Sequence, residues 1–121
     1  MRRAKKGTPY RQALQRKSLH ERSGGRCEAE KYVVRTWMRC THQGVHAAHV
    51  YSRNKCGSDA IRDDLRAVVH LCYGCHTTLG NENLEKDDVR IPAKYARLAW
   101  DFIMEKSKDE PSSRALLGPR P

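Results

Sequence analysis

The stretch HLCYGCH, residues 70–76, holds two histidines and two cysteines, the side chains that most often bind zinc in proteins. Cys72 and Cys75 are three residues apart, so their sulfurs lie about one helical turn from each other. That separation suits two corners of a tetrahedral zinc site. Either the stretch belongs to a structural zinc site alone, or a structural site and a reactive site share it.

A second pair of cysteines, Cys27 and Cys40, is the natural complement to this pair. Twelve residues separate them, more than in a usual zinc knuckle, but a hairpin over EAEKYVVRTWMR would bring them together. We therefore expect a four-cysteine zinc site; the alternative is that Cys27 and Cys40 are ordinary buried thiols. Cys56, which lies alone in a polar stretch, is interpreted as an unpaired thiol.

Size and composition also favour a metal. The chain has 121 residues, enough for one domain, and only 38% of them are apolar. A core this thin usually needs a disulfide or a metal as a staple. Five cysteines is an odd number, which argues against a closed disulfide framework and for metal binding in a reducing compartment. Since there is neither a signal peptide nor an apolar run of about 18 residues, we expect a soluble cytoplasmic protein with no membrane partner.

Positive charge is concentrated at the beginning of the chain. The formal net charge is +10, and residues 1–26 contain nine Lys or Arg against one acid, Glu21. Such a density is typical of a nucleic-acid contact, and the alternative is a solvated tail. We interpret it as an arm that contacts DNA phosphates without reading the bases. The expected contacts are Arg2, Arg3, Lys5, Lys6, Arg11, Arg16 and Lys17.

The elements that must position these residues divide the chain into four segments. They are a basic arm with a short helix, a zinc-stapled module, a C-terminal amphipathic helix and a flexible tail, at residues 1–21, 22–83, 84–106 and 107–121. The first helix is expected from Tyr10 to Arg22 and is ended by the SGG at 23–25. The last helix carries an apolar inner face of Tyr95, Leu98, Ala99, Phe102 and Ile103.

Within the module, two short runs rich in valine predict strands, GVHAAHVY at 44–51 and AVVHL at 67–71. The polar stretch SRNKCGSDAIRDDLR joins them, and loops of this length in a compact domain are usually functional. After the second strand, CYGCHTTLGN predicts a short helix that ends at Gly80. The predicted order is strand, long loop, strand and helix.

The stretches GGRCEA, HAAHVYSR and VVHLCYGCH together resemble the HNH (ββα-metal) endonuclease family, in particular its small phage-type members with a cysteine zinc site. The resemblance covers about residues 22–80. It implies an α+β fold, a small ββα-metal module stapled by a structural Zn²⁺ and flanked by helices. The zinc ligands would be Cys27, Cys40, Cys72 and Cys75.

The resemblance also implies catalytic roles. His49 matches the family's general base, which draws a proton from water in line with a phosphodiester. His76 matches a ligand of the single divalent ion that stabilises the leaving 3′ oxygen. Arg53 stands where the family often has a basic residue near the scissile phosphate. A neutral imidazole suits the base because its unperturbed pKa of about 6.5 is close to working pH.

Two positions depart from the family pattern. The residue before the base, usually a ligand, is Ala48, and the position of the family's asparagine is Ala67. His46 is a substitute ligand, because it lies two residues before Ala48 and so on the same strand face. Other candidates are Asp63, Asp64 and, less favourably, His70. The two alanines have three competing explanations. Other residues bind the metal in their place, the protein is a degenerate member that does not cleave, or the alanines were introduced to disable the enzyme.

The expected function is metal-dependent hydrolysis of DNA phosphodiester bonds with Mg²⁺ or Mn²⁺, and Ni²⁺ as a further possibility. The first alternative is a catalytically degenerate module that holds DNA or a partner nuclease without cutting. The second alternative is a zinc-stapled protein that binds RNA or the ribosome. It is less favoured because the sequence lacks the aromatic residues, set among basic ones, on which single-strand binders stack bases. The resemblance alone suggests that the protein works with a partner in phage DNA packaging or recombination.

Overall fold

The computed structural model describes residues 8–52, 59–80, 83–107 and 117–121, and for residues 8–13 and 59–60 it describes the backbone alone. The protein is a small α+β structure whose strands pair antiparallel. Its helices are α1 (Thr8–Ser23), α3 (Asp59–Arg62), α4 (Tyr73–Leu79) and α5 (Ala93–Lys106), with a 3-10 turn, η1, at Leu65–Ala67. Its strands are β1 (Glu30–Val33), β2 (Thr36–Arg39), β3 (His46–His49), β4 (Val68–Leu71), β5 (Glu85–Lys86) and β6 (Val89–Arg90). None of the described helices combines the length and the apolar character that crossing a membrane requires.

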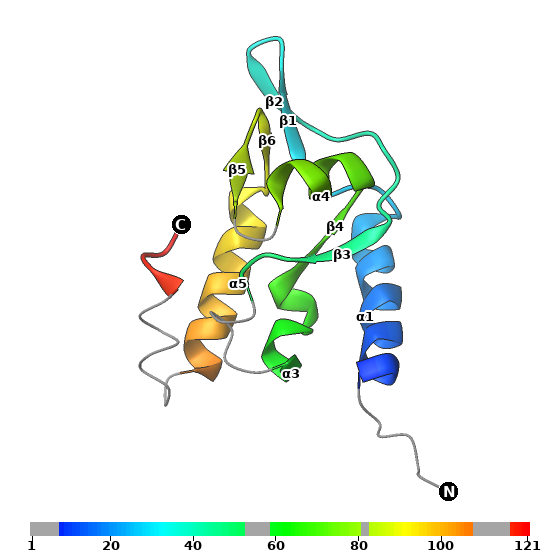
Figure 1. Ribbon diagram of the computed structural model, residues 1–121, viewed down its shortest axis with the longest axis vertical. Helices are drawn as coiled ribbons and strands as arrows, with labels where there is room; N and C mark the ends of the chain where they lie inside the picture. Colours follow the sequence, from blue (N-terminus) through cyan, green and yellow to red (C-terminus); the bar gives the residue numbers. More distant parts are fainter. Residues whose placement is uncertain (1–7, 53–58, 81–82, 108–116) are drawn as a thin grey trace, which may run out of the picture.

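Strands β3 and β4 form a two-stranded sheet, and α4 follows β4 directly (Figure 1). The register places His49 opposite Val68. All four residues of β4 are buried. The Cys72 side chain caps α4 by accepting a hydrogen bond from the Cys75 N–H. The two predicted strands and the helix after them are therefore confirmed, and we call β3, β4 and α4 the ββα unit. The stretch predicted as a long loop instead contains α3 and η1 in its described part.

A second sheet has the strand order β2-β1-β6-β5. Its hairpin β1–β2 turns at Val34 and Arg35, both in the left-handed region with φ of 48° and 67°. This is the hairpin predicted between Cys27 and Cys40. The Cys40 N–H donates to the Ala29 carbonyl at 2.9 Å, so the two ends of the hairpin lie side by side and bring the cysteines together.

In place of the single helix predicted over residues 84–106, the chain forms the small hairpin β5–β6 and then α5, which begins at Ala93. The turn of the hairpin is made by Asp87 and Asp88, with φ of 50° and 63°. Aspartate tolerates this left-handed region better than most residues do. Strand β6 pairs with β1, so the hairpin enlarges the second sheet.

Helix α5 packs most of its predicted face against the core, but Ala96 is buried in place of Leu98. Ala99, Phe102 and Ile103 are buried as expected, and Ala96 is buried as well. Leu98 is 41% exposed instead. It comes one residue before Ala99 and therefore lies about 100° around the helix from it. The buried face of α5 packs against η1 and so covers the residues that lead into β4.

In place of the flexible tail predicted over residues 107–121, the last five residues pack on α5. Leu117 is buried, and the Gly118 carbonyl accepts a 3.1 Å hydrogen bond from Trp100 Nε1. Arg120 donates to both carboxylate oxygens of Asp101, at 2.9 and 3.0 Å. An apolar anchor and an ion pair hold this end of the chain. Residues 108–116 lie outside the described part.

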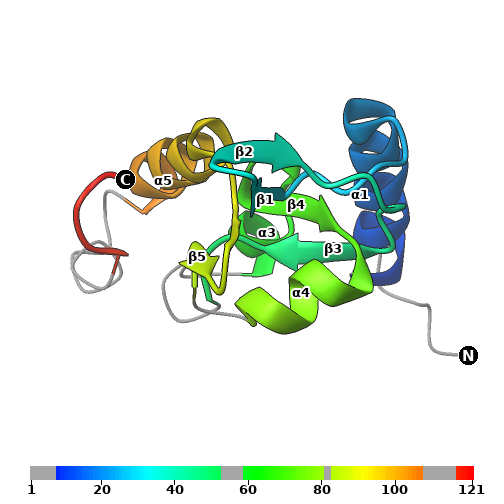
Figure 2. The ribbon, with the colours of Figure 1, turned by 90° about the horizontal axis from the view of Figure 1, so that it is seen from above.

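Helices α1 and α5 flank the ββα unit on opposite sides, as the two views show (Figures 1 and 2). Helix α1 ends at Ser23, at the start of the SGG that is predicted to end it. Gly24 and Gly25 follow with φ of 69° and 77°, values that glycine adopts without strain. The predicted first helix is confirmed, and it begins slightly earlier than expected.

A buried ion pair fixes the end of α1 to the ββα unit. Glu28 is 1% exposed and accepts two hydrogen bonds from Arg22, at 2.6 and 2.9 Å. Arg22 also donates to the carbonyls of Leu65 and Val68, and Glu28 accepts the His70 N–H at 2.8 Å. Burial by itself opposes ionisation of Glu28, but Arg22 and the His70 N–H outweigh it and lower the pKa of this carboxyl.

Replacing Glu28 with Gln should lower the free energy of unfolding by about 3 kcal/mol, because it removes a fully buried carboxylate and leaves the half-buried Arg22 without its counter-charge. Chemical denaturation at pH 7 measures the loss. The matched control is Glu30→Gln, whose carboxylate pairs with Arg90 at 2.8 Å in a partly exposed position. That change should cost less than about 1 kcal/mol. Equal losses from the two substitutions would contradict a structural role for the buried pair.

Candidate metal centre and histidine cavity

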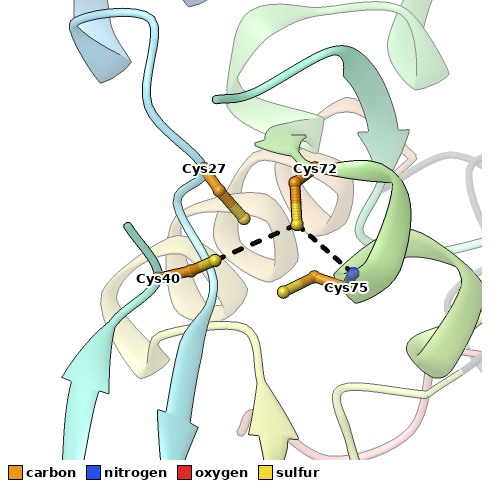
Figure 3. A group of neighbouring side chains, drawn as sticks. All are labelled: Cys27, Cys40, Cys72 and Cys75. Carbon is orange, nitrogen blue, oxygen red and sulfur yellow. Dashed lines mark hydrogen bonds between the residues drawn. The ribbon is translucent and has the colours of Figure 1, made fainter. Parts of the chain in front are cut away.

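Four cysteine side chains converge on one point (Figure 3). The Sγ atoms of Cys27, Cys40, Cys72 and Cys75 all lie within 4.8 Å of one another, and the Sγ atoms of Cys40 and Cys72 are 3.9 Å apart. Sulfurs bound to one zinc ion at ~2.3 Å in a tetrahedron would be ~3.8 Å apart. All four side chains are buried and none forms a disulfide. The cluster therefore has the donor set and nearly the spacing of a structural zinc site.

Two elements supply the four sulfurs. Cys27 precedes β1 and Cys40 follows β2, so the hairpin presents both from its base. The backbone holds them there: the Cys27 N–H donates to the His42 carbonyl at 2.9 Å. Cys72 and Cys75 come from the first turn of α4. A metal held by the cluster would connect the hairpin to α4.

Burial decides the protonation of the thiols in the absence of a cation. It raises the pKa of Cys27 to about 11, and together with the neighbouring cysteines it raises the pKa of Cys75 still further. Burial also opposes ionisation of Cys72, but hydrogen bonds from Cys75 and from the other thiols lower its pKa overall. Four buried thiolates are therefore compatible only with a cation among them, and an all-sulfur tetrahedral set selects zinc over the harder ions.

A cavity of about 270 Å³ lies between α1, β3 and α4. Its lining residues include Gln15, Arg16, His46, His49, Asp63 and His76. The Nδ1 atoms of His46 and His76 are 3.1 Å apart, and their rings meet edge to face. The pKa of His76 is lowered, first by burial and then by His46 and His49. The described structure thus brings together the three histidines that the sequence singled out.

His49 has a carboxylate partner. Its Nε2 lies 3.3 Å from Asp63 Oδ1, and Asp63 is buried while the His49 side chain is one-third exposed. Burial is the strongest influence on the pKa of His49 and lowers it, aided by Arg62 and opposed by Asp63. The imidazole is therefore neutral near pH 7, with a proton on one ring nitrogen and a lone pair on the other.

The other proposed substitute ligands lie elsewhere. His70 is buried against the end of α1, with its Nδ1 2.7 Å from Ser23 Oγ. Asp64 caps η1 and pairs with Arg66. Ala48 and Ala67 are 4% and 1% exposed and belong to the core. Neither alanine lines the cavity, so a larger polar side chain at either position would have to enter the core.

The predicted nucleic-acid contacts are described only in part. Arg16 lines the cavity, and Lys17, next to it on α1, is exposed. The other expected contacts lie outside the described residues or side chains; they are Arg2, Arg3, Lys5, Lys6 and Arg11. Arg53 and Cys56 lie outside the described residues as well.

Sequence reasoning missed the two polar residues on the buried face of α1. Gln15, Leu19 and Ser23 are buried on this helix, while Leu14 is 49% exposed. The Gln15 side chain donates to the Asp63 carbonyl and so joins α1 to the cavity wall. The signal was the four-residue spacing of these three positions, which share one helix face. Two of them are polar, and a search for apolar residues alone passes over them.

Comparisons with protein-family models, with curated proteins and with solved structures find no match. The resemblance to the HNH family therefore depends on the quoted residues alone. The geometry provides two features that share α4: a four-cysteine cluster that could hold a metal and a cavity lined by histidines.

The purified protein should contain about one zinc ion per chain, and chelation should unfold it. Structural zinc contributes roughly 10–16 kcal/mol of binding free energy, as much as the whole stability of a small domain. Elemental analysis and thermal melting with a strong chelator measure both effects. Cys75→Ser should lose the zinc and the cooperative melt, while the matched Cys56→Ser should keep both. A metal-free protein with an unchanged melting temperature would refute the zinc centre.

Proposed function

We propose that the protein is a metal-dependent endonuclease of the HNH type that hydrolyses phosphodiester bonds in DNA. The observation that carries the proposal is the cavity in which His46, His49 and His76 lie together with Arg16. Imidazoles hold divalent ions and take protons from water, and a guanidinium attracts phosphate. Strand β3 and helix α4 position the histidines, and α1 presents Arg16. The order of β3, β4 and α4 is the one that the HNH resemblance implies.

His49 is the proposed general base. Its lowered pKa keeps the imidazole neutral near pH 7, so that it can accept a proton from water. Because Nε2 faces Asp63, the nitrogen left for the water is Nδ1. Arg16 lines the same cavity and would draw the scissile phosphate toward it.

His46 and His76 fit a divalent ion. Two nitrogens bound to one ion at ~2.1 Å and at roughly a right angle are ~3.0 Å apart, and their Nδ1 atoms are 3.1 Å apart. His46 would thus supply the ligand that Ala48 lacks. A divalent ion bound there would neutralise charge on the phosphate and stabilise the leaving 3′ oxygen. Imidazole donors favour Mn²⁺ and Ni²⁺ over Mg²⁺, which prefers oxygen ligands.

The second candidate is a catalytically degenerate module that binds DNA without cutting it. One observation favours it: within the described residues, the cysteine cluster is the one group of three or more metal-binding side chains close enough to share an ion. Two histidines alone would leave the remaining positions to water and phosphate and would hold the ion weakly. Cleavage assays separate the two functions directly.

Zinc-loaded protein should nick supercoiled plasmid with Mn²⁺ or Ni²⁺, and more slowly with Mg²⁺. His49→Ala should reduce the rate by about 10²–10⁴-fold, because a general base contributes that much, with zinc content unchanged and no rescue by added metal. His76→Ala should lose activity together with Mn²⁺ affinity, so high Mn²⁺ should restore part of it. The control is His20→Ala, at an exposed histidine on α1. If none of the three ions supports cleavage, the nuclease proposal is wrong and the DNA-binding module remains.

The basic arm should bind phosphates without reading sequence. Replacing Arg2, Arg3, Lys5 and Lys6 with Gln should weaken binding equally on unrelated duplexes. The slope of log affinity against log salt should flatten by about 0.9 for each phosphate that the arm no longer neutralises. The control removes four charges from β5 and α5, at Lys86, Lys94, Arg97 and Lys106, and should leave the slope nearly unchanged. Altered sequence preference at constant slope would mean that the arm reads bases.

A further inference from the structure

We propose that Asp63 is a positioning residue for His49. It would hold the proton of the imidazole on Nε2 and leave the lone pair of Nδ1 facing the cavity. The inference rests on the proposed nuclease function and deepens it. It also assigns Asp63 a different role from the substitute metal ligand considered from the sequence.

The geometry of the pair carries the inference. Asp63 Oδ1 lies 3.3 Å from His49 Nε2, and the Asp63 side chain is 4% exposed. A carboxylate only accepts hydrogen bonds, so the imidazole must be the donor and its proton must be on Nε2. The opposite tautomer would aim a lone pair at the carboxylate. The candidate metal ligands His46 and His76 lie against each other instead, with their Nδ1 atoms 3.1 Å apart.

Helix α1 supports the position of Asp63. The buried Gln15 side chain donates to the Asp63 backbone carbonyl. Arg62 Nε lies 3.6 Å from Asp63 Oδ1 and keeps a positive charge beside the carboxylate. Arg16, the residue after Gln15 on α1, lines the same cavity. One helix therefore both braces the carboxylate that orients the base and presents a cation to the phosphate.

The chemical step that this arrangement would serve is hydrolysis of the phosphodiester by water. Water gives a proton to His49 Nδ1 as its oxygen bonds to phosphorus, and the bond between phosphorus and the 3′ oxygen breaks. The leaving oxygen takes a proton from solvent. The imidazolium that forms holds protons on both nitrogens, and the Asp63 carboxylate stabilises it through Nε2. Asp63 therefore lowers the barrier without touching substrate.

The first test needs no activity. Nitrogen-15 NMR of the histidine rings in the zinc-loaded protein at pH 8 should show His49 with its proton on Nε2, and Asp63→Asn should convert it to a mixture of tautomers. Asp64→Asn, at the neighbouring carboxylate that caps η1, should leave His49 unchanged. A wild-type His49 with its proton on Nδ1 would overturn the inference, even if the protein cuts DNA.

Kinetics with Mn²⁺ and plasmid provide the second test. Asp63→Asn should lower kcat by about 10²-fold or more, because the wrong tautomer disables the base, while KM, Mn²⁺ affinity and zinc content stay near wild type. In a His49→Ala background the same change should have no further effect. An additional loss in that background, or a weakened affinity for Mn²⁺, would mean that Asp63 acts as a ligand. If wild type cleaves nothing, the nuclease proposal fails while the NMR result still decides the role of Asp63.

Discussion

The convergence of four cysteine sulfurs is the constraint on which the rest of the structure depends. Cys27 and Cys40 come from the base of one hairpin, and Cys72 and Cys75 come from the first turn of α4. With burial raising the pKa of Cys27 and Cys75, the cluster needs a cation to exist as thiolates. Fixing the start of α4 in this way fixes the next residue, His76, against β3.

A second, purely polar anchor completes the cavity. The Arg22–Glu28 pair ties the end of α1 to the residues around β4, at hydrogen-bond distances of 2.6 and 2.9 Å. Two turns earlier on the buried face, Gln15 reaches the Asp63 carbonyl. Different interactions therefore hold the walls of the cavity. The cysteine cluster holds α4, the Arg22–Glu28 ion pair holds α1, and backbone pairing with β4 holds β3. A cavity built this way should keep its shape when one of its histidines is replaced.

The sequence predicted the parts of this arrangement that local pattern controls. The hairpin between Cys27 and Cys40, the two strands of the ββα unit and the helix after them depend on neighbouring residues, and all were found. The stretch predicted as a loop between the strands holds α3 and η1 instead. The hairpin at residues 85–90 has strands of only two residues each, and its pairing with β1 lies far along the chain. The packing of Leu117 also depends on distant residues, so the sequence pattern did not predict either feature. The same holds for the link from Gln15 to Asp63. Ala48 marked a departure from the family pattern, and only its burial showed that the position faces the core.

We propose that the chain uses one metal centre for folding and a separate one for chemistry. Anomalous diffraction from crystals of the zinc-loaded protein soaked in Mn²⁺, with data at the absorption edge of each metal, tests it most directly. We expect a zinc peak among the four Sγ atoms and a manganese peak within bonding distance of His46 and His76. Zinc bound to the histidines beside a metal-free cysteine cluster would contradict it, and so would a histidine cavity without metal at high Mn²⁺.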